Sequence, residues 1–349
     1  MQPLTKRQED IAFIILRNQP VSSSEISEHL KEKVSLVTVK RDVTALRMAG
    51  YVTASGKGRS VAYAITSIGR LFLPIDAHQY CAVEPDARPA SKRFDFELFP
   101  AIPPTLFFSE ERAALDRATG SYHERSRDMS KALHEKELER FVIELSWKSS
   151  KIEGNTYTLL DTERLIRDGV RAPDHSPAEA LMILNHKTAF DFVLSNKDVF
   201  KKGIGRATVE EVHRLLVHGL GVERGIRSRP VGIIGTAYQP LDNPHRIREA
   251  LDGSYAAIHR AEDPYTSALL SLAAISYIQP FEDGNKRTAR LVANALLVAH
   301  DCAPLSYRSV GEVEYREAMI VFYEVRSIHP LKHIFIGQYE FAAGHYASV

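Results

Sequence analysis

Apolar residues recur every three or four positions through most of the chain, a period that predicts amphipathic α-helices. The strongest repeats span residues 137–154, 176–196, 208–220, 267–278 and 287–300. One stretch breaks the pattern: residues 227–241 combine β-branched residues with glycines, which indicates a short β-hairpin. The sequence therefore predicts a mainly α-helical protein with little sheet.

The first 75 residues carry shorter patterns, which predict a separate domain of three helices and a hairpin. Ser22 and Glu25 are spaced as a capping box at the start of the second helix. Two β-rich runs follow Gly50 and flank a Gly-Lys-Gly-Arg tip at residues 56–59. This order of elements is the plan of a winged helix. The first and third helices would bury one apolar face each, made of Ile11, Ile14, Ile15, Leu36, Val39, Val43 and Leu46.

Charge indicates that this domain binds double-stranded DNA. Residues 1–70 hold eleven Lys/Arg and six Asp/Glu, about +5, which leaves about −4 for the rest of a chain of net charge +1. The polar face of the third helix would enter a major groove, and the hairpin tip would reach phosphates. The alternative is a winged helix that serves protein contacts or dimerisation. The candidate DNA-binding residues are Thr38, Lys40, Arg41, Lys57 and Arg59. Residues 37–52 resemble the recognition helix of DeoR-type winged-helix repressors.

Residues 76–104 contain five prolines, which break helices and favour extended chain, so we expect a linker. The predicted organisation is a domain over 1–75, a linker over 76–104 and a helical domain over 105–349.

Composition adds few constraints. At 349 residues, with 44% hydrophobic and 26% charged residues, the chain fits an ordinary globular protein. Two cysteines are too few for a disulfide framework or a cysteine-based zinc site. No signal peptide and no membrane span are expected, because no long apolar run is present. We therefore expect a cytoplasmic protein with no membrane partner.

Residues 276–290 combine features of a phosphate-binding loop. Gly284 permits backbone conformations closed to other residues, and Asn285 is a good N-cap for the helix that follows. Free N–H groups at a helix start attract anions, and Arg287 and Arg290 project near the same place. Asp283 is placed to hold Mg²⁺ on phosphate oxygens. The alternative is an ordinary helix start with a surface arginine pair.

These residues resemble the Fic-family signature, histidine-x-Phe-x-(Asp/Glu)-Gly-Asn-x-Arg-x-x-Arg. Gln279 stands at the position of the histidine, and the matching residues are Pro280, Phe281, Asp283, Gly284, Asn285, Arg287 and Arg290. Residues 225–240 resemble the Fic flap hairpin, and two preceding helical stretches resemble Fic helices. Residues 149–155 resemble the family's inhibitory motif, with Ser149, Glu153 and Gly154 in register. Together the resemblance covers about residues 100–345.

The resemblance implies a Fic fold and transfer of AMP from ATP to a protein hydroxyl. Asp283 would bind Mg²⁺, Arg287 would act in catalysis, and Arg290 would meet the γ-phosphate. The implied nucleotide-binding set is Gly284, Asn285, Lys286, Arg287 and Arg290. The flap would pair with the main chain of the target protein through Val231, Gly232, Ile233, Ile234, Gly235 and Thr236.

The resemblance also implies self-inhibition. The inhibitory helix would lie around residues 138–156, and Glu153 would occupy the guanidinium of Arg290 that the γ-phosphate needs. The modified target could be another protein or the chain itself, and a homodimer is expected by analogy. Lys286 replaces a commoner glycine, and because some relatives with lysine there are phosphotransferases, the transferred group stays open.

Gln279 raises the main question about catalysis. In the family the histidine takes the proton of the attacking hydroxyl, and a general base is typically worth ~10²–10⁴-fold in rate. A glutamine amide has no useful basicity, so transfer should be weak or absent. Three readings stay open: an introduced substitution, a nucleotide-binding transcriptional regulator without catalysis, or another base such as Tyr238 or His245.

Overall fold

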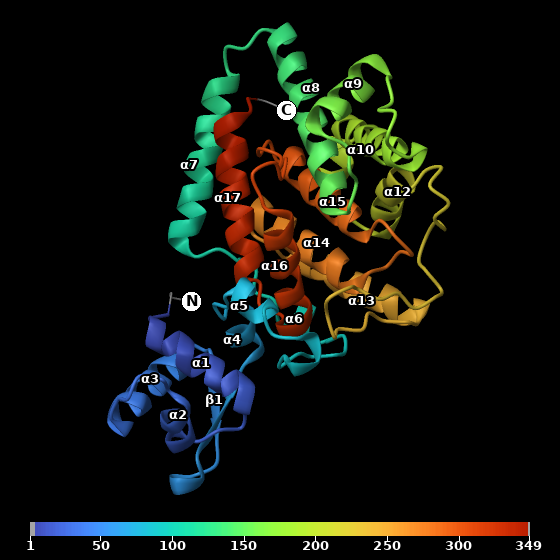
Figure 1. Ribbon diagram of the computed structural model, residues 1–349. Helices are drawn as coiled ribbons and strands as arrows, with labels where there is room; N and C mark the ends of the chain where they lie inside the picture. The colour runs from blue at the N-terminus through green and yellow to red at the C-terminus, as the bar shows by residue number, and fades with distance from the viewer. Residues whose placement is uncertain (1–3, 348–349) are drawn as a thin grey trace.

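The computed structural model describes residues 4–347, and it is predominantly helical (Figure 1). Its N-terminal part contains α1 (Lys6–Asn18), α2 (Ser23–His29), α3 (Leu36–Met48), β1 (Val52–Ser55), β2 (Ala62–Ile65) and α4 (Ser67–Leu71). The rest of the chain forms the body, whose helices are α5 (Ala77–Cys81), α6 (Leu98–Ala101), α7 (Ser109–Ser126), α8 (Lys131–Ile152), α9 (Leu159–Asp168), α10 (Pro177–Ser195), α11 (Lys197–Lys201), α12 (Arg206–Leu216), α13 (Pro244–His259), α14 (Pro264–Ile278), α15 (Asn285–Ala299), α16 (Glu312–Val325) and α17 (His329–His345).

Two central helices, α14 and α15, organise the body (Figure 1). They pack along each other, and almost every side chain on both is buried. Because α14 is apolar on all sides, it can lie only inside a shell of other helices. The loop between them, residues 279–284, is thereby held at a fixed place at the end of the core.

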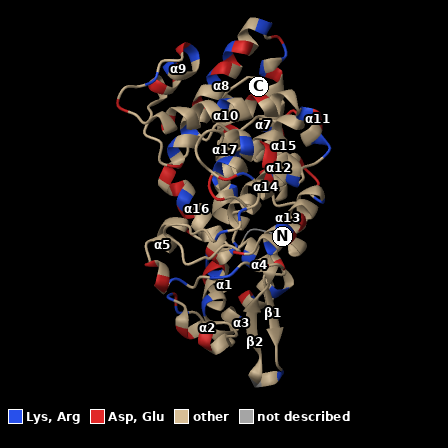
Figure 2. Cartoon of the chain, turned by 90° about the vertical axis from the view of Figure 1, so that its right-hand side faces the viewer, with Lys and Arg blue, Asp and Glu red and all other residues tan. Residues whose placement is uncertain are grey.

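The N-terminal part has the order of elements that the sequence predicts. Ser22 caps α2 in a capping box with Glu25, and β1 pairs antiparallel with β2 from Val52–Ile65 to Ser55–Ala62. The hairpin extends away from the body (Figure 2). The predicted apolar face of α3 is correct except at Leu36, which is 40% exposed because it begins the helix, where no neighbour covers it.

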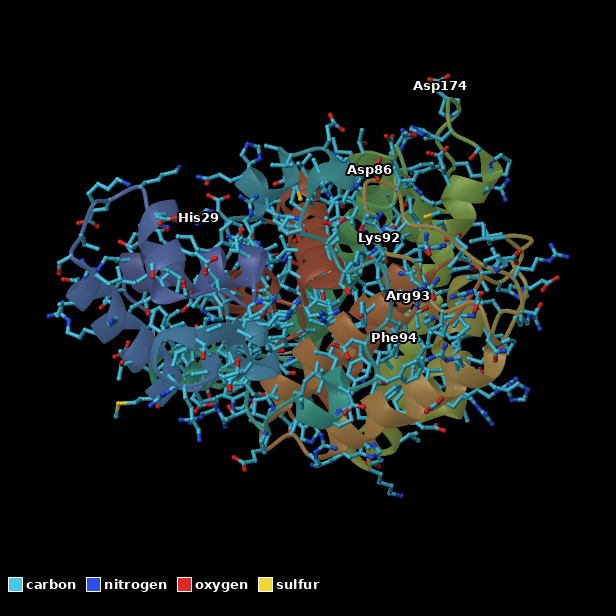
Figure 3. All side chains as sticks on the ribbon, turned by 90° about the horizontal axis from the view of Figure 1, so that it is seen from below. His29, Asp86, Lys92, Arg93, Phe94 and Asp174 are labelled. Atoms are coloured by element: carbon cyan, nitrogen blue, oxygen red, sulfur yellow. The ribbon has the colours of Figure 1, made fainter. Side chains whose placement is uncertain are left out.

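The segment 76–104 is not the extended chain that its prolines suggested. It contains the short helices α5 and α6, and α5 packs on α16. Phe94, labelled in Figure 3, stacks on Tyr277 of α14 with ring centroids 4.8 Å apart. The prolines keep the helices to about one turn, but aromatic side chains still attach the segment to the core.

The hairpin predicted within residues 227–241 is also wrong. These residues form a loop with a turn at Ile234–Gly235, and no strand is assigned between α12 and α13. A strand needs a hydrogen-bonded neighbour, and this loop faces a cleft rather than another strand. Among the described helices, none is long and apolar enough to cross a bilayer.

Candidate active site

An open cleft with about 390 Å³ of free space lies where five parts of the body meet. The end of α8, the flap, the 279–284 loop, the start of α15 and one face of α16 line it. It brings together most of the residues that the sequence singled out, although they come from segments more than 130 residues apart.

Two left-handed residues shape the loop at the base of the cleft. Gln279 ends α14 with φ +51°, and Gly284 precedes α15 with φ +77°. A Cβ at Gly284 would also lie 3.0 Å from Cγ1 of Val217. Glycine therefore fits this position both in conformation and in space.

The sequence suggested that Asn285 caps α15, but this is wrong, because Gly284 is the N-cap and Asn285 is the first residue of the helix. Its side chain instead accepts from the backbone N–H of Phe281 and donates to the carbonyl of Phe281, both at 2.8 Å. The amide thus closes the loop onto the first turn of α15. The residues at the start of α15 line the cleft, and the backbone N–H groups that a helix leaves free in its first turn would stabilise an anion there.

His213 of α12 supports the loop from behind. Its ring stacks on Phe281 at 3.7 Å, and Nε2 lies 3.0 Å from the carbonyl of Asp283. Because a carbonyl only accepts, Nε2 carries the proton and Nδ1 does not. Burial lowers the pKa of His213 to about 4, so the ring is neutral near pH 7.

Arg287 offers a cation at the cleft wall. Its side chain is buried, Nη2 lies 3.2 Å from Oδ2 of Asp283, and burial lowers its pKa from the usual value. Nη1 has no hydrogen-bond partner among the described residues. An unpaired nitrogen on a buried guanidinium is costly, so this group fits a bound anion.

Arg290 is fully buried and held by the end of α8. Nη1 donates to Oε1 of Glu153 at 2.9 Å, while Nε and Nη2 donate to the hydroxyl and carbonyl of Ser149 at 2.9 and 2.7 Å. Nζ of Lys286 lies 3.3 Å from the other Glu153 oxygen. Burial by itself would raise the pKa of Glu153, but the positive charges of Arg290 and Lys286 lower it by more. The net shift of the pKa is downward, and the carboxylate stays charged.

The backbone at the end of α8 lets Glu153 reach Arg290. Glu153 is the C-cap of the helix, and Gly154 follows with φ +95°, a conformation suited to glycine. Behind Ser149, Nε2 of the buried His186 lies 2.9 Å from the Ser149 hydroxyl. Burial, together with Arg290 and Arg287, lowers the pKa of His186 to about 3.

Gln279 lies at the cleft with its side chain turned back onto its own helix. Its amide nitrogen donates to the carbonyl of Ser276 at 2.7 Å, and its backbone carbonyl accepts from Nε of Arg227 at 2.7 Å. Tyr238 and His245 do not take the place of a base. The Tyr238 hydroxyl is buried on the carbonyl of Tyr277, and neither residue lines the cleft.

The flap divides into two halves. Val231, Gly232, Ile233 and Ile234 line the cleft, and Ile234 is 99% exposed. Gly235 and Thr236 do not line it and contact Arg88 and Glu324 instead.

The candidate DNA-binding residues lie on the N-terminal part and away from the cleft. Lys40, Arg41 and Lys57 are exposed, and Thr38 is half-buried beside Ser35. The side chain of Arg59 lies outside the described part of the structure.

Sequence reasoning missed three supports of the site, namely His213 as a loop support, His186 and Arg227. Their neighbours are distant in sequence, and the only signal was a charged or imidazole side chain inside an apolar pattern.

The fold and the cleft define a helical domain in which a loop with two nearby arginines joins two buried helices. Residues 204–297 match the family model of the Fic/DOC family. The chain is 30% identical over 175 residues to protein adenylyltransferase Fic of Nematostella vectensis, which is 49% of this chain and 41% of that protein. It is 23% identical to protein adenylyltransferase fic-1 of Caenorhabditis elegans, over 60% of this chain and 43% of that protein. The chain thus spans less than half the length of these curated relatives.

Solved structures agree on the fold. Fic-1 from C. elegans superimposes with a TM-score of 0.59 at 20% identity, covering 68% of this chain and 72% of that chain. A Fic-domain-containing signalling protein from Bacteroides thetaiotaomicron superimposes with a TM-score of 0.54 at 18% identity, covering 67% of this chain and 98% of that chain. The body of this protein therefore has the fold of these Fic proteins, and residues 204–297 within it match the family model.

Proposed function

We propose that this protein is a Fic-type protein adenylyltransferase that Glu153 holds inactive and in which Gln279 makes transfer weak. The observation that carries the proposal is the ion pair between the fully buried Arg290 and Glu153, which lines the cleft together with Arg287 and the start of α15. A carboxylate on that guanidinium occupies the place that a terminal phosphate would take.

The phosphates would bind at the loop. The N–H groups at the start of α15 and Nη1 of Arg287 would receive phosphate oxygens, and Arg290 would receive the γ-phosphate once Glu153 leaves. Lys286, 28% exposed, would add positive charge at the same place.

A magnesium ion fits the same site. Asp283 is 67% exposed at the cleft, and the described residues hold no group of three or more His, Cys, Asp or Glu that could bind a metal alone. One carboxylate is enough in nucleotide sites, because phosphate oxygens and water complete the Mg²⁺ shell. Asp283 would hold the ion, which would neutralise charge on the phosphates.

The target protein would lie on the cleft-facing half of the flap. No backbone hydrogen bond is formed by Val231–Ile234 within the described residues, so these groups are available to a target strand. The hydroxyl of that strand would then be directed at the α-phosphate beside Gln279.

The second candidate is a transcriptional regulator that binds nucleotide without chemistry. Gln279 favours it, because the amide cannot take a proton at neutral pH. In both cases we propose that the N-terminal part is a winged helix that binds DNA, supported by its order of elements and by its positive charge.

The test uses ATP labelled at the α- or γ-phosphate, with Mg²⁺, on the wild-type chain and on Glu153→Gly. Transfer of α-label to protein by Glu153→Gly supports the adenylyltransferase, and γ-label would show phosphate transfer instead. If only a chain carrying Gln279→His transfers label, the native protein is the nucleotide-binding regulator.

A further inference from the structure

Glu324 of α16 is a fully buried carboxylate outside the anion-binding loop. Three segments converge on it. The hydroxyl of Tyr80 donates to Oε2 at 2.8 Å, and the hydroxyl of Thr236 and the N–H of Ala237 donate to Oε1 at 2.7 and 3.0 Å. Nη1 of Arg88 lies 3.4 Å from Oε1. A buried carboxylate is stable only with such partners, and here all of them come from the flap and from segment 76–104.

Arg88 and its neighbours tie this segment to the flap a second time. Nη1 of Arg88 donates to the carbonyl of Gly235 at 2.9 Å. Further along, the N–H of Gln239 donates to the carbonyl of Lys92 at 2.9 Å. The second half of the flap, residues 235–239, is therefore bonded to segment 88–92 at two places besides Glu324.

The two halves of the flap differ in this respect. Residues 231–234 line the cleft and form no backbone hydrogen bond within the described part of the chain. Residues 235–237 are fixed to α16 and to segment 76–104. A target strand that pairs with residues 231–234 would thus bind a segment whose position is set by the immobilised residues 235–237.

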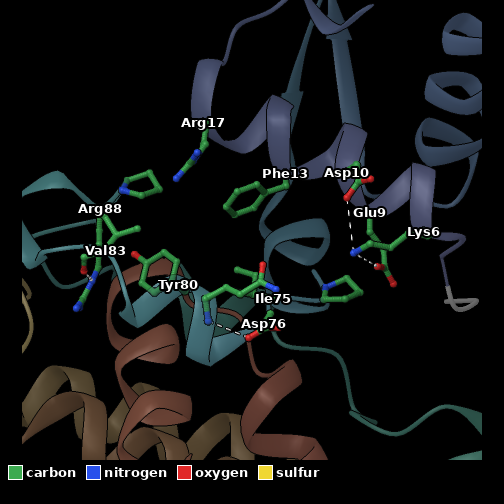
Figure 4. Close-up of a pocket in the computed structure, with 13 residues that line it drawn as sticks. Lys6, Glu9, Asp10, Phe13, Arg17, Ile75, Asp76, Tyr80, Val83 and Arg88 are labelled. Atoms are coloured by element: carbon green, nitrogen blue, oxygen red, sulfur yellow. Dashed lines mark hydrogen bonds and ion pairs between the residues drawn. The ribbon is translucent and has the colours of Figure 1, made fainter. Parts of the chain in front are cut away.

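Tyr80 and Arg88 contact two parts of the molecule. Besides holding Glu324, they line a groove whose other wall is α1, with Phe13 and Arg17 directed into it (Figure 4). The segment that holds the flap is therefore the one that leads out of the N-terminal part and packs beside it.

We propose that Glu324 is a positioning residue for the target protein, and that Tyr80 and Arg88 make the flap depend on the segment leading from the N-terminal part. The proposal rests on the proposed function, in which the flap aligns the target. Loss of either partner frees residues 235–237 and spoils target alignment, while the nucleotide loop keeps its shape.

The first test is amide hydrogen exchange of the full chain without nucleotide. Tyr80→Phe removes one donor to Glu324 and touches neither flap nor cleft, and exchange at residues 235–237 should become roughly fivefold faster or more. Tyr255→Phe is the matched control, because the buried Tyr255 hydroxyl has no hydrogen-bond partner among the described residues. Unchanged exchange in Tyr80→Phe, with exchange in α14 also unchanged, would overturn the proposal.

The second test separates positioning from folding. In a Glu153→Gly/Gln279→His background, Tyr80→Phe should raise KM for a protein target severalfold and leave KM for ATP and kcat unchanged. A general loss of structure would instead lower kcat and raise both KM values, and this result would overturn a positioning role. Hydrogen exchange needs no transfer, so a protein that fails to adenylylate can still show the flap anchored, and the two failures are distinguishable.

Discussion

At the scale of single residues, Arg290 is the group whose neighbours determine what the cleft can bind. Each of its three nitrogens donates to Ser149 or Glu153, and the rings of Tyr307 and Tyr315 lie 6.0 and 5.5 Å from its guanidinium carbon. A cation buried this deeply needs an anion. If Glu153 is removed, the γ-phosphate of ATP is the natural replacement.

Glu153→Gly should therefore tighten ATP binding by about tenfold or more and change ADP binding little, since ADP has no γ-phosphate. The estimate corresponds to one hydrogen bond to a charged group, worth about 1.5–3 kcal/mol. Titration calorimetry measures both constants. Glu124→Gly, an exposed glutamate near the end of α7, is the matched control. Equal ATP affinity in the wild type and Glu153→Gly would contradict inhibition by Glu153.

Gln279 has a backbone conformation that a histidine can also adopt. Its φ of +51° lies in the left-handed region, where histidine is enriched several-fold among non-glycine residues. Gln279→His should therefore fit without moving the loop, which makes this substitution a clean test of the missing base.

At the scale of elements, the loop between α14 and α15 depends on α12 through His213. The ring is neutral and donates to the Asp283 carbonyl, and burial holds its pKa at about 4 against about 6.5 in an unfolded chain. Between these pH values the unfolded state binds a proton that the folded state does not. Stability therefore falls as pH drops through this window.

His213→Gln should remove part of this pH dependence. Glutamine can keep the donor to Asp283 and does not titrate. Between pH 7 and pH 5 the wild type should lose about 2 kcal/mol more unfolding free energy than the variant. Urea unfolding at the two pH values measures this, with exposed His218→Gln as the control. Identical losses in His213→Gln and the wild type would rule out a buried neutral His213.

Periodicity predicted the long helices well, because burial of one face dominates their formation. Sequence patterns gave wrong predictions where contacts between distant segments determine the local structure. The flap has the composition of a strand but no strand beside it, and Asn285 looks like a cap although Gly284 starts the helix. The resemblance to the inhibitory motif implied that Glu153 and Arg290 act together, but the second cation, Lys286, and the Arg227 contact became visible only in three dimensions.

At the scale of the whole molecule, a basic N-terminal part is joined to the Fic-like body through segment 76–104. The exposed face of α3 and the hairpin tip point away from the body, so a duplex could approach them without touching the cleft (Figures 1 and 2). This arrangement is compatible with the proposed roles, in which the N-terminal part binds DNA and the cleft binds a nucleotide.

Lys40→Ala and Lys57→Ala should each weaken DNA binding about uniformly across sequences and lower the slope of log K against log salt by about one. Each lysine is exposed and would neutralise one phosphate. Fluorescence anisotropy with a labelled duplex over a salt series measures this. Lys131→Ala, on the 91% exposed lysine of α8, is the control and should change nothing. If neither lysine affects the slope, the N-terminal part does not bind DNA as proposed.

The most direct test of the central claim compares rates of AMP transfer from α-labelled ATP by Glu153→Gly and by Glu153→Gly/Gln279→His. If the phosphate cradle is intact and only the base is missing, the added histidine should accelerate transfer by ~10²–10⁴-fold. Equal rates in the two variants, or no label from the double variant on any protein tested, would contradict it.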